Sequence, residues 1–331
     1  MGNCLKHFKQ QLPSIAPKPL IIPPIFSARK RESESLQIRG LKKATKKFRQ
    51  DRVVECEDYS VRKFYKGYID ETTFAPSRAG TGIAVSVMEC DSSRSLQDWM
   101  AVVRSLGQLS HQNLVNFLGY CCEDNKPFFL VFEYSHKGSL DSHIFGKEEE
   151  ALPWEIRVKI AIGTAQGLAF LHSIKNSPLN RELRMHNIML DEQYNAKLFY
   201  LEPTKRSLVD EGLKRGRFTY LSPEWGSLGI LDMTTDVYIF GMILLELLMG
   251  SKDRKKIKEE QGLVDYWTSS FLPDNYKIEE IIDPRLGSDY SANAATQMGT
   301  LINRCTAHNT KKRPLMQQVL DGLNHIAEIK D

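Results

Sequence analysis

Two short stretches of this chain carry side chains that could do chemistry. The first four residues, MGNC, would expose Gly2 to N-myristoylation after removal of the methionine, and the Cys4 thiol could take a palmitoyl chain. Within residues 180–187, NRELRMHN, the carboxylate of Glu182 precedes the amide of Asn187 by five positions. A carboxylate can accept a proton, and an amide oxygen can bind a cation. The first stretch therefore predicts a lipid anchor, and the second is a candidate catalytic loop.

The lipid anchor needs a second signal, because a single myristoyl chain binds membranes only marginally. A palmitate on Cys4 would provide one. Basic residues of the same tail would provide another by attraction to anionic lipids: Lys6, Lys9, Lys18, Arg29, Lys30 and Arg31. Lys6 departs from the Ser or Thr that the myristoylation motif prefers at this position. An unmodified basic start is therefore the alternative interpretation.

Charge is distributed very unevenly along the chain. The formal net charge is +4, yet residues 1–50 hold twelve Lys and Arg and only two acidic residues, Glu32 and Glu34. That segment carries +10, and the remaining 281 residues carry −6. The segment has only Phe8, Phe26 and Phe48 as aromatic residues and shows no recognition-helix pattern, which disfavours nucleic acid as a partner. A membrane surface is the partner that this charge distribution favours.

Length and composition indicate a globular protein. The 331 residues are 41% hydrophobic and 26% charged, enough for one two-lobed domain of roughly 270–290 residues plus a tail. The six cysteines show no metal-type C-x-x-C spacing and no secretory signal precedes them, so we expect reduced thiols and neither disulfides nor a metal site. The longest apolar run, 237–249, contains Glu246 and is shorter than the roughly 18–20 residues that span a bilayer. It predicts a buried helix.

Apolar spacing predicts strands first and helices later. The proline-rich stretch 11–35 reads as an extended linker, with order beginning near residue 36. Alternating or continuous apolar runs predict strands, and helical apolar spacing predicts helices, over these ranges: strands at 82–89 and 128–134, helices at 96–106, 154–172, 235–248 and 313–329. A strand-rich first half and a helical second half indicate an α+β protein.

Several longer motifs carry a resemblance to a known family. They are LKKATKKF, LGQLSHQNLVNFLGYCCED, KGSLDSHIF, GLAFLH, YNAKL, SPEW, DVYIFG and KKRP, together with the stretch 180–187. From about Leu41 to the C-terminus the chain resembles the protein-kinase fold, and most of all the plant receptor-like cytoplasmic kinases. The resemblance implies a disordered basic tail at 1–35, a small β-rich N-lobe with one main helix at 36–134, and a larger α-helical C-lobe at 135–331.

The resemblance also implies that the nucleotide-binding residues of the N-lobe are degenerate. Active kinases cover the nucleotide phosphates with a glycine-rich loop, and here Glu57, Tyr59 and Arg62 fall on its three glycine positions. The lysine that grips the α- and β-phosphates falls on Ser86. The helix glutamate that would pair with this lysine falls on Val102. Both halves of the ion pair are replaced, which avoids a buried unpaired charge.

The catalytic loop is degenerate in the same way. Glu182 stands at the position of the catalytic aspartate, one methylene longer, although the neighbouring Arg181 is retained. Arg184 replaces a lysine that would approach the γ-phosphate, and Tyr200 replaces the aspartate that is the principal magnesium ligand. Asn187 is retained, but one amide oxygen is a poor magnesium site. No intact catalytic site and no metal site is expected.

The residues that the family uses for architecture are, in contrast, mostly present. Glu224 resembles the glutamate that pairs with an arginine near the C-terminus, and Arg313 matches that arginine. Asp236 resembles the aspartate that ties down the catalytic-loop backbone, while His172 is expected to cap or pack. The chain keeps the scaffold and loses the chemistry.

The leading interpretation is a pseudokinase, a non-catalytic binding module tethered to the cytoplasmic face of the plasma membrane and otherwise cytoplasmic. It would act as a signalling adaptor or decoy in plant receptor-kinase or immune signalling. The resemblance implies receptor kinases, active cytoplasmic kinases or immune receptors as partners, and neither ATP nor magnesium as a cofactor.

Two alternatives remain open. A weak or unorthodox serine/threonine kinase would need ATP and magnesium, and Arg62 lies near the place where with-no-lysine kinases carry their substitute lysine. A phosphorylation-controlled switch would use hydroxyls between residues 203 and 221 as acceptors: Thr204, Ser207 and Thr219. The second alternative is compatible with the pseudokinase interpretation.

Overall fold

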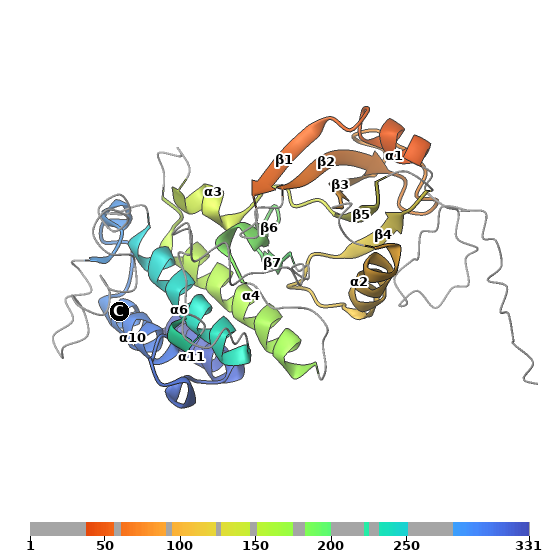
Figure 1. Ribbon diagram of the computed structural model, residues 1–331. Coiled ribbons are helices and arrows are strands. Elements are labelled where there is room, and N and C mark those ends of the chain that lie inside the picture. Colours follow the sequence, from red (N-terminus) through yellow and green to blue (C-terminus); the bar gives the residue numbers. More distant parts are fainter. Residues whose placement is uncertain are drawn as a thin grey trace, which may run out of the picture.

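The protein has two lobes, described here from a computed structural model (Figure 1). The structure describes residues 38–55, 61–90, 95–123, 127–145, 151–174, 183–199, 222–224, 232–250 and 281–330, with the backbone alone at 52–55 and 61–62. A sheet with one long helix makes up the smaller N-lobe, and packed helices make up the C-lobe. This is the α+β, two-lobed arrangement that the resemblance implied. The predicted tail at 1–35 lies outside the described residues.

One antiparallel sheet forms the N-lobe. Its strands are β1 (Gln50–Glu55), β2 (Val61–Ile69), β3 (Ile83–Glu89), β4 (Phe117–Cys121) and β5 (Phe129–Glu133), in the order β1-β2-β3-β5-β4. The strands predicted at 82–89 and 128–134 are β3 and β5. In the register, Ser86 lies opposite Lys66 on β2 and opposite Phe132 on β5. Paired residues share a face of the sheet, so these three positions belong to one surface.

The two faces of this sheet are buried against different helices. On the inner face Phe64, Met88 and Phe132 pack with α2 (Leu96–Gln108), the helix predicted at 96–106. Its buried residues Trp99, Val102, Val103 and Leu106 follow helical spacing, and Ser95 caps its start by accepting the Asp98 N–H. The outer face packs against α1 (Ile38–Ala44), which was not predicted.

A left-handed turn follows α1. Lys46, Lys47 and Phe48 have φ values of 51°, 66° and 56°, which residues other than glycine rarely adopt in succession. The fully buried Thr45 supports the turn, because its hydroxyl donates to the Leu41 carbonyl and accepts the Phe48 N–H. The Phe48 ring then stacks on that of Phe129, with centroids 4.9 Å apart.

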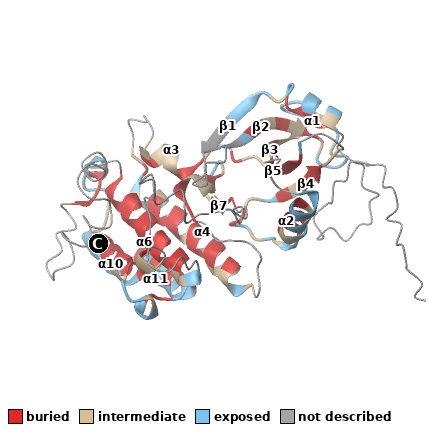
Figure 2. Cartoon of the chain, in the orientation of Figure 1, coloured by how far each residue is buried: buried red, intermediate tan, exposed pale blue. Residues whose placement is uncertain are grey.

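The C-lobe is built around α6 (Met233–Met249), which is buried from Thr235 to Met249 (Figure 2). Around it lie α3 (Leu140–Phe145), α4 (Trp154–Ser173), α10 (Ala292–Cys305) and α11 (Met316–Glu328), with a short antiparallel pair, β6 (Ile188–Leu190) and β7 (Ala196–Leu198). None of the described helices is long and apolar enough to cross a membrane. The four described cysteines of both lobes are free thiols: Cys90, Cys121, Cys122 and Cys305.

Two predicted helix starts differ from the structure. The helix predicted from 235 begins at Met233, because Asp232 accepts the N–H groups of Thr234 and Thr235 and so starts the helix earlier. The helix predicted from 313 begins at Met316. Arg313 precedes a proline and is extended, with φ −68° and ψ 139°, because a residue before proline avoids the helical region.

Candidate functional site

Among the described residues, little space is left where the two lobes meet at the inner face of the sheet. The cavity at the inner face of the sheet measures only about 50 Å³, against roughly 300–1,000 Å³ for ligand pockets in general. Its walls come from both lobes and include Ser86 on β3, Phe132 on β5, Met189 on β6 and Phe199 after β7. The position that would hold a phosphate-binding lysine therefore borders a space of one or two water molecules.

Three phenylalanines, which we call the aromatic cluster, fill this cleft: Phe64, Phe132 and Phe199. The ring of Phe199 lies 4.9 Å from that of Phe132 and 5.5 Å from that of Phe64, at interplanar angles of 68° and 75°. Such edge-to-face contacts are favourable beyond the area they bury. The three residues are 1%, 1% and 5% exposed. Because Phe199 belongs to the C-lobe and the other two to the N-lobe, the cluster joins the lobes.

Backbone contacts fix the position of Phe199. Its N–H donates to the carbonyl oxygen of Asn187 at 2.7 Å. Asn187 itself ends a single 3₁₀ turn, Met185–Asn187, and its N–H donates to the Arg184 carbonyl. The retained Asn187 of the predicted catalytic loop thus lies directly beside the aromatic cluster.

Val102 belongs to the same apolar core. It is 2% exposed on α2 and lies in the cluster of buried residues that contains Phe64, Met88, Phe132 and Phe199. Ser86 is partly buried on the neighbouring strand face. An active kinase holds a lysine–glutamate pair at these two positions, as the resemblance implies, whereas this chain packs apolar side chains around them.

A cation does lie beside Ser86, on the adjacent strand. Lys66 is directly opposite Ser86 in the β2–β3 register, and its Nζ lies 3.8 Å from the ring centroid of Tyr134. Tyr134 follows β5 in the segment that joins the lobes. A cation over an aromatic face is held there by the ring quadrupole. Lys66 is therefore held by a cation–π contact with Tyr134 of the inter-lobe segment.

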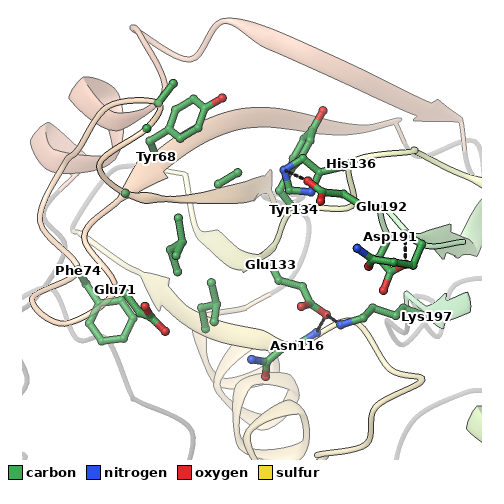
Figure 3. A pocket seen from close by; sticks show the side chains of 17 residues that line it. Tyr68, Glu71, Phe74, Asn116, Glu133, Tyr134, His136, Asp191, Glu192 and Lys197 are labelled. Carbon is green, nitrogen blue, oxygen red and sulfur yellow. Dashed lines mark hydrogen bonds and ion pairs between the residues drawn. The ribbon is translucent and has the colours of Figure 1, made fainter. Parts of the chain in front are cut away.

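A second, open cavity of about 780 Å³ lies beside the inter-lobe segment (Figure 3). It is lined by the β2–β3 connection, the end of β5 and the β6–β7 turn. In Figure 3 the carboxylate of Glu133 points toward Lys197, at 2.7 Å, while His136 faces Glu192 at 3.7 Å. With Glu71 and Asp191 also on its wall, the cavity has more carboxylates than cations, which disfavours phosphate groups.

The C-lobe keeps its charged framework. Arg313 donates to both carboxylate oxygens of Glu224, at 2.6 and 2.8 Å, and also to the carbonyls of Thr234 and Ala307. This is the pair that the resemblance implied. Burial alone would raise the pKa of Glu224, but the hydrogen bonds from Arg313 outweigh it and hold that pKa below its ordinary 4.5.

A buried carboxylate on α6 contacts the end of α4. The Nε2 atom of His172 lies 2.9 Å from Oδ2 of the fully buried Asp236. The histidine that was expected to cap or pack therefore pairs with the aspartate that was expected to support the catalytic loop. Its role in the described structure is to connect two helices.

A third buried contact was not predicted. Arg157, on α4, donates to the carbonyls of Leu152 and Leu247 and to the carboxylate of Asp283, all within 2.6–2.7 Å. The exposed fractions of the Arg157 and Asp283 side chains are 3% and 1%. Burial raises the pKa of Asp283, but hydrogen bonds from Arg285 and Arg157 bring it below its ordinary 3.8.

Many of the predicted site residues lie outside the described part of the chain. These are the catalytic-loop, glycine-loop, lipidation and phosphorylation candidates Arg181, Glu182, Tyr200, Glu57, Tyr59, Gly2, Cys4, Thr204, Ser207 and Thr219; for Arg62 only the β2 backbone is described. Among the residues that are described, no group of three or more His, Cys, Asp or Glu is placed to hold a metal ion. The aromatic cluster does not fit a magnesium nucleotide, because its rings would have to move to admit the base.

Sequence reasoning missed the aromatic cluster and Lys66, although a signal was present. Phe64 follows the degenerate glycine loop by two residues, and Phe199 directly precedes Tyr200. In the sequence, each phenylalanine taken by itself looks like an ordinary core residue. Only the fold brings together residues that lie more than sixty positions apart.

Comparisons with known proteins agree with this geometry. The family model "Protein tyrosine and serine/threonine kinase" matches residues 61–323. The inactive serine/threonine-protein kinase BKN2 of Arabidopsis thaliana is 59% identical over 340 residues, covering 100% of both chains. The rice receptor-like cytoplasmic kinase 176 is 38% identical over 302 residues, covering 88% of this chain and 75% of that protein.

Solved structures give the same fold. The pseudokinase DRIK1 (drought responsive inactive kinase 1), in a co-crystal with ENMD-2076, superposes with a TM-score of 0.66 at 24% identity, covering 91% of this chain and 98% of that one. An apo pseudokinase superposes with a TM-score of 0.65 at 24% identity, covering 90% and 98%. At this identity the likeness concerns the fold alone.

Proposed function

This chain belongs to the protein kinase family, and we propose that it is a pseudokinase that works by docking to partners instead of transferring phosphate. The observation that carries the proposal is the aromatic cluster. Phe64, Phe132 and Phe199 occupy the cleft where a nucleotide base would lie, and only about 50 Å³ remains. A kinase that cannot seat the base cannot position the γ-phosphate for transfer.

Residue chemistry supports the same conclusion. Ser86 and Val102 carry no charge at the positions of the lysine–glutamate pair, and Tyr200 provides no carboxylate for magnesium. Phosphoryl transfer depends on positioning and on cations that neutralise developing charge. The name of the 59% identical relative, an inactive kinase, agrees with this interpretation.

The finer proposal concerns location and pathway. Gly2, Cys4 and the basic tail support a tether at the cytoplasmic face of the plasma membrane. The relatives include receptor-like cytoplasmic kinases, which supports an adaptor or decoy role in plant receptor-kinase or immune signalling. Receptor kinases, active cytoplasmic kinases or immune receptors are the proposed partners.

A phosphotransfer assay tests the catalytic half of the proposal. The purified full chain is incubated with labelled ATP, a protein substrate and either Mg²⁺ or Mn²⁺, beside its Glu182→Gln variant. We expect both proteins to give the same background incorporation. Metal-dependent transfer that disappears in Glu182→Gln would establish a weak kinase and overturn the proposal.

Acylation and binding assays test the other half. Wild type and Gly2→Ala are compared for lipid incorporation and membrane recovery in plant cells, and we expect Gly2→Ala to lose both. Binding to an active receptor-like cytoplasmic kinase should survive Glu182→Ala. Loss of the complex on that substitution would show that the catalytic loop, and not a docking surface, holds the partner.

A further inference from the structure

A concentrated basic surface lies on the described part of the N-lobe, apart from the tail. Residues 38–50 read IRGLKKATKKFRQ and contain no acidic residue. Six cations within them, which we call the α1 basic surface, are all exposed: Arg39, Lys42, Lys43, Lys46, Lys47 and Arg49. They are half of the cations of residues 1–50. Figure 2 shows this outer side of α1 as exposed.

The six cations are available for a partner. None of them takes part in an ion pair or cation–π contact among the described residues. Two buried side chains, Leu41 and Ala44, hold the opposite side of α1 against the sheet. The helix can approach so closely because the β2 residue beneath it is Gly67, where a Cβ would lie 3.1–3.3 Å from Thr45 and Ala44.

The left-handed turn extends this surface beyond the helix. A strained turn persists only where its surroundings hold it in place. Here the buried Thr45 hydroxyl and the stacking of Phe48 on Phe129 hold it. As a result Lys46, Lys47 and Arg49 remain exposed, and backbone hydrogen bonds join Lys46 and Lys47 to Lys43 and Lys42.

We propose that the α1 basic surface docks on an anionic bilayer, so that the outer face of the N-lobe lies toward the membrane. Clustered lysines and arginines are attracted to the negative surface of the cytoplasmic leaflet. The basic tail precedes residue 38 directly, so any lipid attached at Gly2 would keep this surface close to the bilayer. This inference rests on the proposed membrane tether and adds an orientation to it.

A bilayer explains this surface better than nucleic acid does. Proteins that bind single strands provide aromatic platforms on which bases stack. The only aromatic residue between 38 and 50 is Phe48, and its ring is occupied by Phe129 and Tyr65. What remains exposed on this segment is a set of flexible cations, which suits a diffuse layer of lipid headgroups.

A vesicle-binding experiment tests the proposal on the full chain, produced without acylation so that the lipid anchor does not contribute. Cosedimentation is measured with vesicles of phosphatidylcholine alone and with 30 mole percent of phosphatidylserine, a proportion of roughly physiological order. The variant is Lys42→Gln/Lys43→Gln/Lys46→Gln/Lys47→Gln. Each cation in contact with an anionic surface contributes roughly fivefold to partitioning, so contact by two of the four already predicts a loss of about 25-fold in this variant.

The matched control removes the same charge from the C-lobe. Arg304, Lys311, Lys312 and Lys330 are also exposed and form no ion pair among the described residues, so Arg304→Gln/Lys311→Gln/Lys312→Gln/Lys330→Gln tests net charge alone. We expect it to bind within about twofold of wild type, since these residues lie far from α1. Equal losses in the two variants would overturn the proposal and leave only a general charge effect.

A second measurement requires no variant. Hydrogen exchange of the wild type should slow over residues 38–50 when phosphatidylserine vesicles are added, and remain unchanged with phosphatidylcholine alone. No protection there would overturn the proposal, as would preferential binding of an oligonucleotide at the same salt concentration. If the acylated protein is recovered on membranes but the α1 basic surface fails both the vesicle-binding and the hydrogen-exchange test, the lipid tether is supported and the proposed orientation is overturned. If the α1 basic surface passes both tests while Gly2→Ala is recovered on membranes as well as wild type, the docking surface is supported and the lipid tether is overturned.

Discussion

The C-lobe framework and the cleft between the lobes differ in how they treat buried charge. In the C-lobe, Arg157 and Asp283 are almost fully buried, and Arg157 donates to Asp283 and to two carbonyls. Arg313 likewise donates two hydrogen bonds to Glu224. In the cleft, the two positions at which the resemblance implies an ion pair, Ser86 and Val102, are uncharged, and phenylalanines pack beside them. In each region the two members of a buried ion pair are therefore either both present or both replaced by uncharged residues.

This difference follows from the cost of isolating a charge. Breaking a buried ion pair by removing one partner typically costs about 3–5 kcal/mol, whereas exchanging the whole pair for apolar side chains is often neutral or stabilising. Replacement of both members of a lysine–glutamate pair, as the resemblance implies for Ser86 and Val102, is therefore compatible with a stable fold. The C-lobe pairs stay complete, and each joins segments far apart in the sequence, Arg157 with Asp283 and Arg313 with Glu224.

The largest effect is expected from Arg157→Ala. The substitution removes the buried guanidinium that donates to Asp283 and to two carbonyls, while the more exposed Arg285 still donates to Asp283, so the free energy of unfolding should fall by about 3–5 kcal/mol. Urea unfolding measures it. Arg285→Ala is the matched control, since Arg285 contacts the same carboxylate but its side chain is 29% exposed, and its loss should be much smaller. Equal losses would show that burial does not decide the cost.

Phe199→Ala tests how much the apolar packing in the cleft contributes to stability. Removing this ring from between Phe64 and Phe132 leaves a cavity, and the free energy of unfolding should fall by about 3 kcal/mol. Phe199→Leu refills most of the space and should lose less than about 1.5 kcal/mol. Chemical denaturation of the three proteins measures the series. An alanine variant as stable as wild type would mean that the aromatic cluster does not hold the lobes together.

Reintroducing charge into the cleft should be penalised unless it is paired. Val102→Glu places a carboxyl among apolar side chains and should cost about 2–3 kcal/mol. Adding Ser86→Lys should restore part of that loss, because the lysine can then pair with the new glutamate. A double-mutant cycle in urea measures the coupling. A double variant no more stable than the sum of the single losses predicts would show that the cleft has no room for the pair.

Acid should weaken the C-lobe framework. The pKa values of Glu224 and Asp283 in the folded protein lie below their ordinary 4.5 and 3.8, so the unfolded state binds protons first as the pH falls. Their contribution to stability is present above those values and is lost below them. Thermal unfolding between pH 3 and 6 should show a falling midpoint below about pH 4.5, with a shallower fall in Glu224→Gln.

The smallest effect is expected at the edge of the cleft. Lys197 and Glu133 form an ion pair of 2.7 Å, but their side chains are 21% and 28% exposed. Exposed pairs contribute about 0–1 kcal/mol, so Lys197→Met should change the free energy of unfolding by less than about 1 kcal/mol. A loss comparable with that of Arg157→Ala would contradict the ordering by burial.

Periodicity predicted the long elements, and local chemistry decided their ends. The helices at 96–106 and 154–172 were close to α2 and α4 because their buried positions repeat with helical spacing. The predicted starts of α6 and α11 were wrong, because Asp232 caps the first helix and Pro314 keeps Arg313 out of the second. No helix was predicted over α1, whose two buried residues, Leu41 and Ala44, give too short a pattern.

Site residues that lie near a sequence motif could be predicted, whereas contacts that form only when the lobes pack together could not. Ser86 and Val102 could be placed from neighbouring motifs, and the fold puts Val102 in the core and Ser86 at the cleft. The contacts of Phe199 with Phe64 and Phe132 could not be predicted, since they depend on how the two lobes meet. The resemblance implies that catalytic groups are replaced, and the structure shows apolar packing around Val102 and a small cavity beside Ser86.

Nucleotide binding tests the central claim most directly. The purified full chain is titrated with ATP, in the presence and absence of Mg²⁺ or Mn²⁺, while its thermal midpoint is recorded; a ligand that binds only the native state raises the midpoint. We predict no shift at millimolar nucleotide, because the aromatic cluster occupies the cleft. A metal-dependent rise would contradict the account, since it would mean that these rings move aside and that the cleft still holds a nucleotide.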